Sequence, residues 1–97
     1  MRRVMVRYKV TPGRAEENAA LVRAVYEELA ATNPPGLRYA TFRLDDGVSF
    51  VHVASVEGDD NPLGEVAAFA RFQAGVRDRC AVQPVVTELH EVGSYRP

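Results

Sequence analysis

Tryptophan is absent from this sequence, and cysteine and lysine each occur once. A lone thiol, Cys80, excludes an internal disulfide framework and is typical of a reducing compartment. No apolar run approaches the roughly 20 residues that a membrane-spanning helix needs. The start of the chain also lacks the apolar region and cleavage site of a signal peptide. We therefore expect a cytoplasmic protein with no membrane partner.

An excess of either charge is missing as well. The 12 basic and 13 acidic side chains give a formal net charge of -1 at pH 7, so electrostatics do not favour a nucleic-acid partner. There is no glycine-rich phosphate loop. His52 and His90 lie on separate segments with no cluster of metal ligands beside them. We expect no cofactor and no bound metal, which leaves cofactor-independent chemistry or none.

What the sequence does contain is a regular order of periodic segments. Alternating and helical patterns predict a strand over Val4–Val10, a helix over about Arg14–Ala31, a hairpin of Leu37–Leu44 and Val48–Val56, a second helical region after Pro62, and a strand over Val85–Val92. Asn61 or Asp60 would cap the second helical region, which is one helix or two short ones because Gly64 and Gly75 weaken it.

The order β-α-β-β-α-β predicts an α+β, ferredoxin-like split βαβ fold in a single domain over residues 1–97. Its antiparallel sheet would carry both helices on one face. The strands are apolar enough that the other face cannot simply be left in water. A second copy is the expected cover, so we expect a homodimer whose two sheets form a dimeric α/β barrel.

The turn Asp45–Gly47 sets the register of the hairpin. A loop of two residues, or of three with a bulge at Gly47, shifts the register by one residue. We favour the register that turns an apolar set toward the helices: Ala40, Phe42, Leu44, Val51 and Val53. The other set would face the barrel: Tyr39, Thr41, Arg43, Phe50 and His52. Burying Arg43 under the helices would leave a charge without an obvious partner.

Five residues are candidates for a site on the barrel face. His52 titrates near neutral pH and could act as a base or an orienting donor. Arg43 and Arg7 could stabilise an oxyanion or hold an anionic ligand. Tyr39 and Phe50 could hold a planar ring. We therefore predict His52 and Arg43 as catalytic residues, and Arg7, Tyr39 and Phe50 as substrate-binding residues.

Each candidate also has a purely structural interpretation. His52 could hydrogen-bond across a dimer or to a buried tyrosine. The arginines could pair with Glu88 or Glu91 of the last strand or guard the sheet edge. Aromatic residues on strands commonly belong to the core.

The chain resembles small dimeric α/β-barrel proteins of the antibiotic-biosynthesis-monooxygenase type. The matching segments are the strand and turn Val4–Arg14, a helix beginning near Glu16, the hairpin from Arg38–Leu44 to Phe50–Val56, and an acidic loop before Phe69–Phe72. In that family two ferredoxin-like protomers enclose a ligand cavity. Some members oxidise aromatic polyketides or quinols with dioxygen and without metal or flavin, whereas others degrade haem or isomerise small metabolites.

The resemblance implies two functions. The first is a cofactor-independent, monooxygenase-like enzyme acting on a small aromatic or quinol-type compound in a cavity of the dimer. The second is a non-catalytic dimer that binds a small ligand or serves as an accessory protein. Family members commonly carry Trp or Tyr with an acidic residue after the third strand and a histidine early in the second helix. Only Glu57 matches, which argues against haem degradation.

Overall fold

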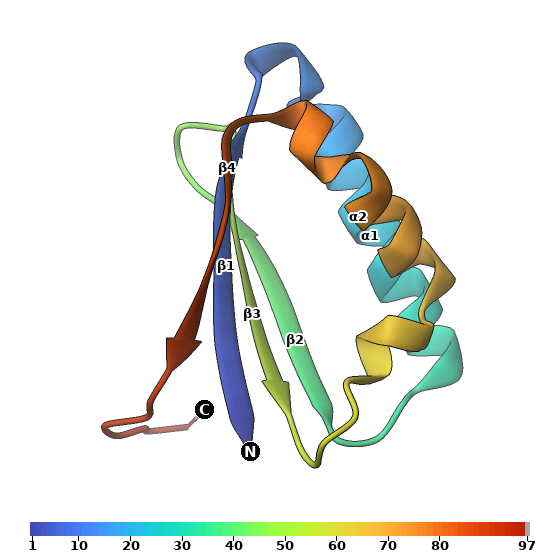
Figure 1. The fold of residues 1–97 in the computed structure, drawn as a ribbon, viewed down its shortest axis with the longest axis vertical. Helices are drawn as coiled ribbons and strands as arrows, with labels where there is room; N and C mark the ends of the chain where they lie inside the picture. Colours follow the sequence, from blue (N-terminus) through green and yellow to red (C-terminus); the bar gives the residue numbers. More distant parts are fainter. Residues whose placement is uncertain (97) are drawn as a thin grey trace.

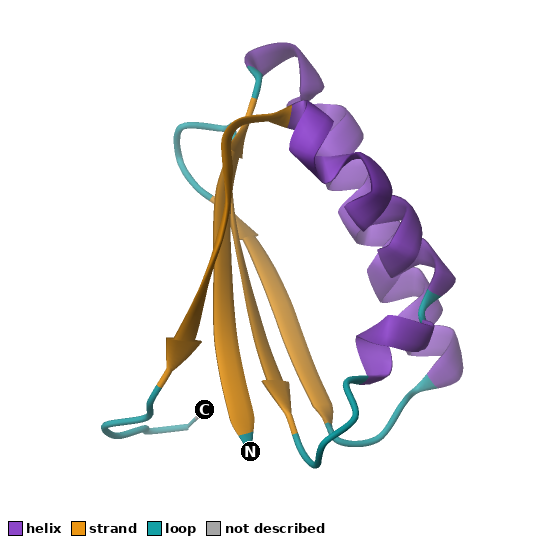
Figure 2. Cartoon of the chain, in the orientation of Figure 1, coloured by secondary structure: helices purple, strands orange, loops and turns teal. Residues whose placement is uncertain are grey.

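Strands and helices alternate in the predicted order along residues 1–96, the part of the chain that this computed structural model describes. The elements are β1 (Arg2–Val10), η1 (Pro12–Arg14), α1 (Ala15–Thr32), β2 (Leu37–Arg43), β3 (Ser49–Val56), η2 (Pro62–Glu65), α2 (Ala67–Arg79) and β4 (Cys80–Leu89). The sheet order is β2-β3-β1-β4, and all neighbours are antiparallel. Both helices cover one face of the sheet (Figure 1, Figure 2). The predicted ferredoxin-like fold is confirmed.

Helix α1 begins and ends close to the predicted positions. Glu16 and Glu17 lie in its first turn, where carboxylates complement the positive end of a helix. It ends at Asn33, which adopts a left-handed conformation and donates its backbone N–H to the Leu29 carbonyl at 2.7 Å. None of the helices in residues 1–96 is long and apolar enough to cross a membrane.

The second helical region is divided in two. Asn61, one of the two predicted caps, caps η2, because its side chain accepts the backbone N–H of Leu63 at 3.0 Å. The start of α2 is capped from the neighbouring helix. The Glu28 carboxylate accepts the backbone N–H groups of Ala67 and Ala68 at 3.0 and 2.9 Å. This contact satisfies two otherwise free donors and fixes α2 against α1.

Strand β4 differs from the prediction at both ends. It begins at Cys80, directly after α2, instead of at Val85, and it ends at Leu89 instead of Val92. Pro84 lies inside the strand, although proline has no N–H to donate to a ladder. Arg7 pairs with Val85 and Lys9 with Val82, so β4 carries one extra residue at this point. A bulge in an edge strand can hold a proline without breaking a central ladder.

The hairpin has the favoured register with a longer turn than expected. Leu44 and Ser49 still form a backbone hydrogen bond of 2.9 Å, which leaves four loop residues between them. Gly47 adopts a φ of 77°, as its place in the turn requires. The Asp46 carboxylate accepts the backbone N–H groups of Val48 and Ser49, and with the Ser49 hydroxyl these bonds lower the Asp46 pKa to about 2.

The two hairpin faces are the reverse of the prediction. Phe42 lies opposite Val51 and Thr41 opposite His52, so the two predicted groups are each intact. However, Phe42 is 58% exposed, whereas His52 is 4% exposed and lies beneath the helices. The apolar set therefore lies on the sheet face that the helices leave uncovered. The mixed set fits beneath the helices because its polar atoms bond to one another and to helix side chains.

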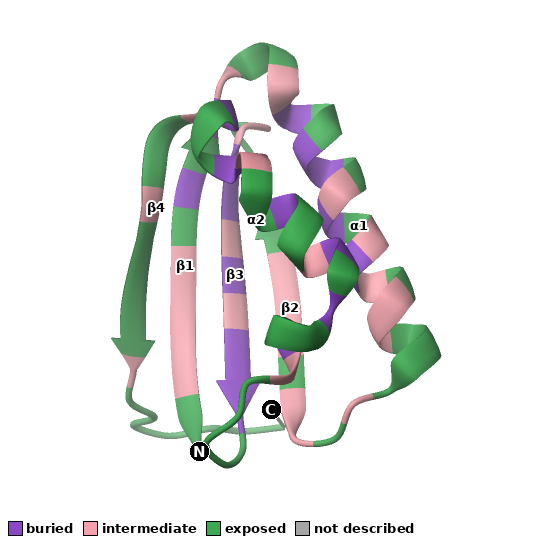
Figure 3. Ribbon diagram, turned by 45° about the vertical axis from the view of Figure 1, so that its right-hand side comes forward, coloured by how far each residue is buried: buried purple, intermediate pink, exposed green. Residues whose placement is uncertain are grey.

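The core is centred on β3, which lies between β1 and β2 and beneath the helical layer. Figure 3 shows β3 mostly buried and the edge strand β4 mostly exposed. On the face away from the helices, Phe42, Val82 and Val85 each remain more than half exposed. The sheet thus presents an apolar face that the described residues leave uncovered.

Candidate functional site

A cavity of about 480 Å³ lies between the helix-facing side of the sheet and α2. Leu63 of η2 also lines it, and Figure 1 shows the helical layer and the sheet further apart here than where α2 runs into β4. Most lining side chains are apolar or aromatic. Three polar side chains come from the sheet: Tyr8 on β1, Tyr39 on β2 and His52 on β3. Its size and lining are typical of a site for a small organic molecule.

His52 is the centre of a hydrogen-bonded group in the cavity wall. Its Nε2 lies 2.8 Å from the hydroxyl oxygen of Tyr8. Its Nδ1 lies 2.6 Å from the Tyr39 hydroxyl and 3.1 Å from Thr41 Oγ1. Val6 and Thr41 are its direct neighbours on β1 and β2, so the strand register places all these groups on one face.

Burial determines the protonation of this group. It lowers the pKa of His52 to about 4, so the imidazole is neutral at pH 7. It raises the pKa of Tyr8 to about 12 and also raises the pKa of Tyr39, so both phenols keep their protons. The cavity wall therefore holds a neutral imidazole between two protonated tyrosines.

The hydrogen-bonded group continues away from the cavity through two buried side chains. Asn18 Nδ2 donates to the Tyr8 hydroxyl at 2.9 Å, and Arg79 Nε donates to Asn18 Oδ1 at 3.1 Å. Asn18 is fully buried and Arg79 is 2% exposed. Neither residue was singled out from the sequence. The sequence does hold one sign of Asn18: its helical spacing from Val22 and Val25 places this polar residue on the same apolar face of the helix.

Aromatic rings hold the two tyrosines in place. Tyr8 stacks on Phe50 with centroids 5.6 Å apart, and Tyr39 stacks on Tyr26 at 5.3 Å. Phe72 of α2 packs against the His52 ring at 5.3 Å. Rings packed in this way restrict rotation of the side chains whose hydroxyls reach the cavity.

The five predicted site residues do not form one site. His52 and Tyr39 line the cavity, while Phe50 lies behind Tyr8 in the core. Arg43 leaves the cavity and bonds to Glu16 of α1, with Nη1 and Oε2 2.7 Å apart. The prediction that His52, Tyr39, Phe50 and Arg43 face a barrel is therefore wrong. The charge of Arg43, at the end of its strand, is balanced on the helix side by a carboxylate of α1.

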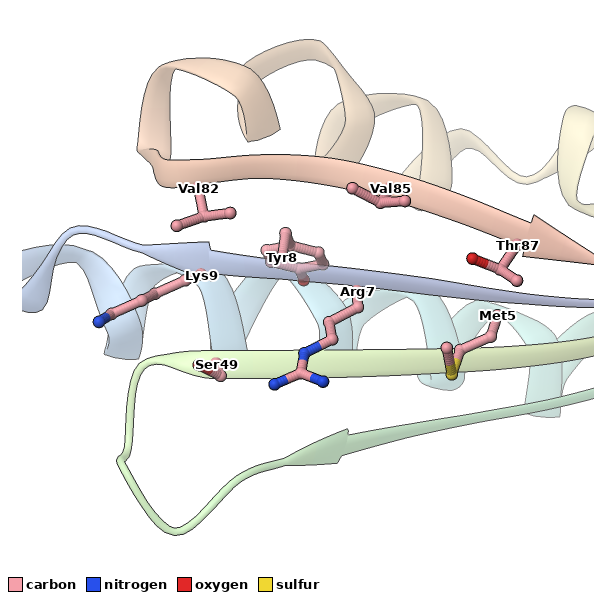
Figure 4. A pocket seen from close by; sticks show the side chains of 8 residues that line it. All are labelled: Met5, Arg7, Tyr8, Lys9, Ser49, Val82, Val85 and Thr87. Carbon is pink, nitrogen blue, oxygen red and sulfur yellow. The ribbon is translucent and has the colours of Figure 1, made fainter.

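Arg7 is the one predicted site residue on the opposite face. There it lines a depression of about 350 Å³ together with Met5, Lys9 and Val85. Figure 4 shows its side chain extending from β1 across β3, on the side away from the helices. Arg7 therefore lies across the sheet from His52.

Residues 1–96 contain no group of three or more His, Cys, Asp or Glu side chains placed to hold a metal ion. Burial raises the pKa of the Cys80 thiol, which favours the protonated form. Within the described residues, the sheet contributes hydroxyls and a neutral imidazole to the cavity beneath α2, and the helical layer and its loop contribute the side chains of Asn61, Gln73 and Arg77.

No family model matches this chain, and no curated protein matches it in sequence. Solved structures do match it over nearly its whole length. A candidate antibiotic biosynthesis monooxygenase from Nitrosomonas europaea has a TM-score of 0.78 at 17% identity, covering 96% of this chain and 100% of the other. A second, from Caulobacter crescentus, has a TM-score of 0.67 at 23% identity, covering 95% and 90%.

A protein from Mycobacterium tuberculosis also matches, with a TM-score of 0.71 at 20% identity and 96% of each chain covered. The chain has the fold of these proteins. At such identities the match concerns the arrangement of elements, and it agrees with the resemblance inferred from the sequence. The activity has to be argued from this chain's own cavity.

Proposed function

We propose that this chain is a monooxygenase-like enzyme that oxidises a small phenol- or quinol-type aromatic compound with dioxygen in the cavity beneath α2. The observation that carries the proposal is the neutral His52, held between the hydroxyls of Tyr8 and Tyr39 in an aromatic cavity of about 480 Å³. The descriptions given to proteins of the same fold support this reaction class.

Four residues at the cavity have a role in this proposal. The Tyr39 hydroxyl donates a hydrogen bond to the substrate oxygen and stabilises its anionic form, as donors in an oxyanion site do. His52 orients that hydroxyl. Phe69 and Phe72 line the cavity beside it and exclude water from the ring. Arg43 and Arg7 have no role here, because one pairs with Glu16 and the other lies on the opposite face.

The reaction balances without an external reductant. In an anthrone-type substrate, the anion formed by loss of a ring CH₂ proton donates electrons to dioxygen. One oxygen atom becomes the new carbonyl oxygen on that carbon. The other leaves as water with the two hydrogens that the carbon loses. The enzyme then has to stabilise the substrate anion and shield it, which are the tasks that the cavity residues fit.

Oxygen uptake with a panel of anthrones and hydroquinones tests the proposal. We expect uptake above the uncatalysed rate, and a loss of roughly a hundredfold in kcat/KM for Tyr39→Phe, which removes one oxyanion donor and keeps the ring. Tyr95→Phe is the matched control, because Tyr95 is 81% exposed. Uptake no faster than without protein would refute the enzyme. Turnover unchanged by His52→Ala would remove His52 from the mechanism.

A second function is supported by a specific observation. Both ring nitrogens of His52 are bonded to protein hydroxyls, and Arg43 is bonded to a carboxylate. Such pairing fits a cavity that binds a ligand without reacting with it. Binding of the same aromatic panel, measured by fluorescence and without any oxygen uptake, would favour this non-catalytic role.

We also propose that a second copy of the chain covers the uncovered sheet face and gives the dimeric α/β barrel. The support is the apolar surface of that face, where Phe42 and Val85 are 58% and 59% exposed. Exposed apolar side chains gathered on one sheet face are costly to leave in water. In this arrangement Arg7 and the His52 cavity lie on opposite sides of each sheet, so each protomer keeps its own cavity.

A further inference from the structure

The hydrogen-bonded chain behind the cavity ends at a group that can only donate. Arg79 is buried, with Nε bonded to Asn18 Oδ1 at 3.1 Å and Nη2 bonded to the Phe72 carbonyl at 3.0 Å. A guanidinium has five N–H donors and no acceptor. The Asn18 atom that faces Arg79 must therefore be its oxygen. Its amide nitrogen consequently faces the Tyr8 hydroxyl, and the orientation of this amide is fixed.

The direction of the next bond follows from Asn18. The Tyr8 hydroxyl has two hydrogen-bond partners within the described part of the chain, Asn18 Nδ2 and His52 Nε2. An amide nitrogen cannot accept a hydrogen bond. The single proton of Tyr8 must then go to His52 Nε2. A nitrogen that accepts carries no proton, so the neutral ring has its proton on Nδ1.

The other side of the ring completes the argument. The proton on His52 Nδ1 points to the Tyr39 hydroxyl at 2.6 Å, with Thr41 Oγ1 further away at 3.1 Å. Tyr39 thus accepts from the imidazole. Thr41 also hydrogen-bonds to the Tyr39 hydroxyl, and this bond lowers the Tyr39 pKa, as a donor to the phenol oxygen does. Tyr39 therefore accepts from both His52 and Thr41, which leaves its own hydroxyl proton to point into the cavity. Because Tyr39 lines the cavity, this proton is available to a ligand.

We propose that Arg79 and Asn18 are positioning residues that direct every hydrogen bond from Arg79 to Tyr39. The cavity then presents the Tyr39 O–H donor and selects ligands with an electron-rich oxygen, such as a phenolate or enolate, at that point. The ligand class rests on the proposed function. The position of the His52 proton does not.

The charge of Arg79 supports the same preference. No ion pair between Arg79 and a carboxylate occurs in the described residues, although the guanidinium is almost fully buried. A buried charge that is balanced only by dipoles is costly to maintain. The electric field of the guanidinium favours negative charge at the end of the hydrogen-bonded chain that reaches the cavity. If position 79 only had to stabilise the fold, an apolar side chain would do so without the cost of burying a charge.

Nitrogen-15 NMR of the imidazole tests the position of the proton without any ligand. A His90→Gln background leaves His52 as the single histidine of the sequence. We expect the wild-type arrangement to show a protonated Nδ1 and an unprotonated Nε2. A proton on Nε2, or a charged ring at pH 7, would overturn the proposal.

The Asn18→Asp variant should reverse the chain. The new carboxylate keeps a partner in Arg79 but offers Tyr8 an acceptor instead of a donor. Tyr8 then donates to the carboxylate and accepts from His52 Nε2–H, and Tyr39 turns its proton to Nδ1. We expect the imidazole proton to move from Nδ1 to Nε2. Asn33→Asp is the control: it makes the same change at an exposed helix end and should leave the imidazole proton on Nδ1. A proton that stays on Nδ1 in the folded Asn18→Asp variant would contradict the mechanism.

Binding of 1-naphthol, compared with naphthalene, tests the ligand preference by fluorescence. The wild type should bind the naphthol on the order of tenfold more tightly, as one hydrogen bond allows. Tyr39→Phe and Asn18→Asp should both remove the difference. Equal affinities in the wild type would overturn the ligand preference, even with the proton on Nδ1. A confirmed proton position without oxygen uptake would refute the enzyme and leave the positioning role intact. If Asn18→Asp fails to fold, the wild-type NMR and the Tyr39→Phe binding data decide.

Discussion

Arg79 occupies the space that a side chain at Gly75 would need. A Cβ placed on Gly75 would lie 2.9 Å from Arg79 Nη1, closer than such atoms approach. The guanidinium cannot move away freely, because Nε and Nη2 are bonded to Asn18 and to the Phe72 carbonyl. A glycine within a helix costs about 1 kcal/mol relative to alanine. Here it leaves room for the buried charge four residues along α2.

Gly75→Ala should accordingly stabilise the protein only when Arg79 is absent. In an Arg79→Met background, alanine should raise the free energy of unfolding by about 1 kcal/mol through its better helix propensity. In the wild type, displacement of the guanidinium should offset that gain. Denaturant unfolding of the four proteins measures the coupling. An identical gain in both backgrounds would show that Arg79 does not constrain Gly75.

His52 should make stability depend on pH. Its pKa is about 4 in the folded protein and 6.5 as the ordinary value. Between pH 6.5 and 4 the unfolded chain binds more protons, so this contribution is complete above pH 6.5 and is lost as the pH falls toward 4. It amounts to about 3 kcal/mol. The difference in unfolding free energy between the wild type and His52→Gln should change by this amount across the window, whereas titrating groups that both share cancel. Parallel curves would contradict the burial of a neutral imidazole.

Arg43→Gln should leave oxygen uptake and aromatic binding unchanged, although the sequence suggested a catalytic role. The Arg43 guanidinium donates to Glu16 Oε2 at 2.7 Å and to the Gly47 carbonyl at 2.8 Å, away from the cavity lining. The hydrogen bond from Arg43 lowers the pKa of Glu16. Carbon-13 NMR of the Glu16 carboxyl should therefore show its pKa rising toward the usual value in the variant. A loss of turnover would restore Arg43 to the mechanism.

Phe42→Glu should separate the proposed dimer into folded monomers. The substitution places a charge on the apolar sheet face, where burial against a second copy would leave it unpaired. Analytical ultracentrifugation measures the mass, and circular dichroism verifies the fold. Ala20→Glu, at an exposed position of α1, is the control and should remain dimeric. A wild-type protein that sediments only as a monomer would refute the assembly.

Sequence periodicity was enough to predict the order of elements and the grouping of Phe42 with Val51 on one face of the hairpin. It could not decide which face of the hairpin meets the helices, because both faces carry side chains that fit a buried surface. The apolar set was assigned to the helices by counting. The outcome depended instead on partners that lie far apart in sequence, namely Tyr8 for His52 and Glu16 for Arg43.

The limits at the cavity have the same cause. His52 and Tyr39 were recognised as candidates by residue type. Asn18 and Arg79 were not, since each looks like an ordinary helix residue until the fold places them beside one another, 61 positions apart in sequence. The sequence predicts too late a start for β4, because Pro84 reads locally as the end of the preceding helix. The edge position of β4 and the bulge opposite Tyr8 permit the proline inside the strand.

Pro84 has a consequence for how copies of this chain can associate. An exposed sheet edge is a template on which another strand can add, and repeated addition produces open fibres. The β4 edge offers an interrupted row of donors, since proline has no N–H and the extra residue breaks the regular spacing. Growth from that edge is disfavoured, whereas the broad face of the sheet can be buried once, by one copy. In the proposed assembly, the geometry of a single strand thus directs association toward a closed pair and away from an endless array.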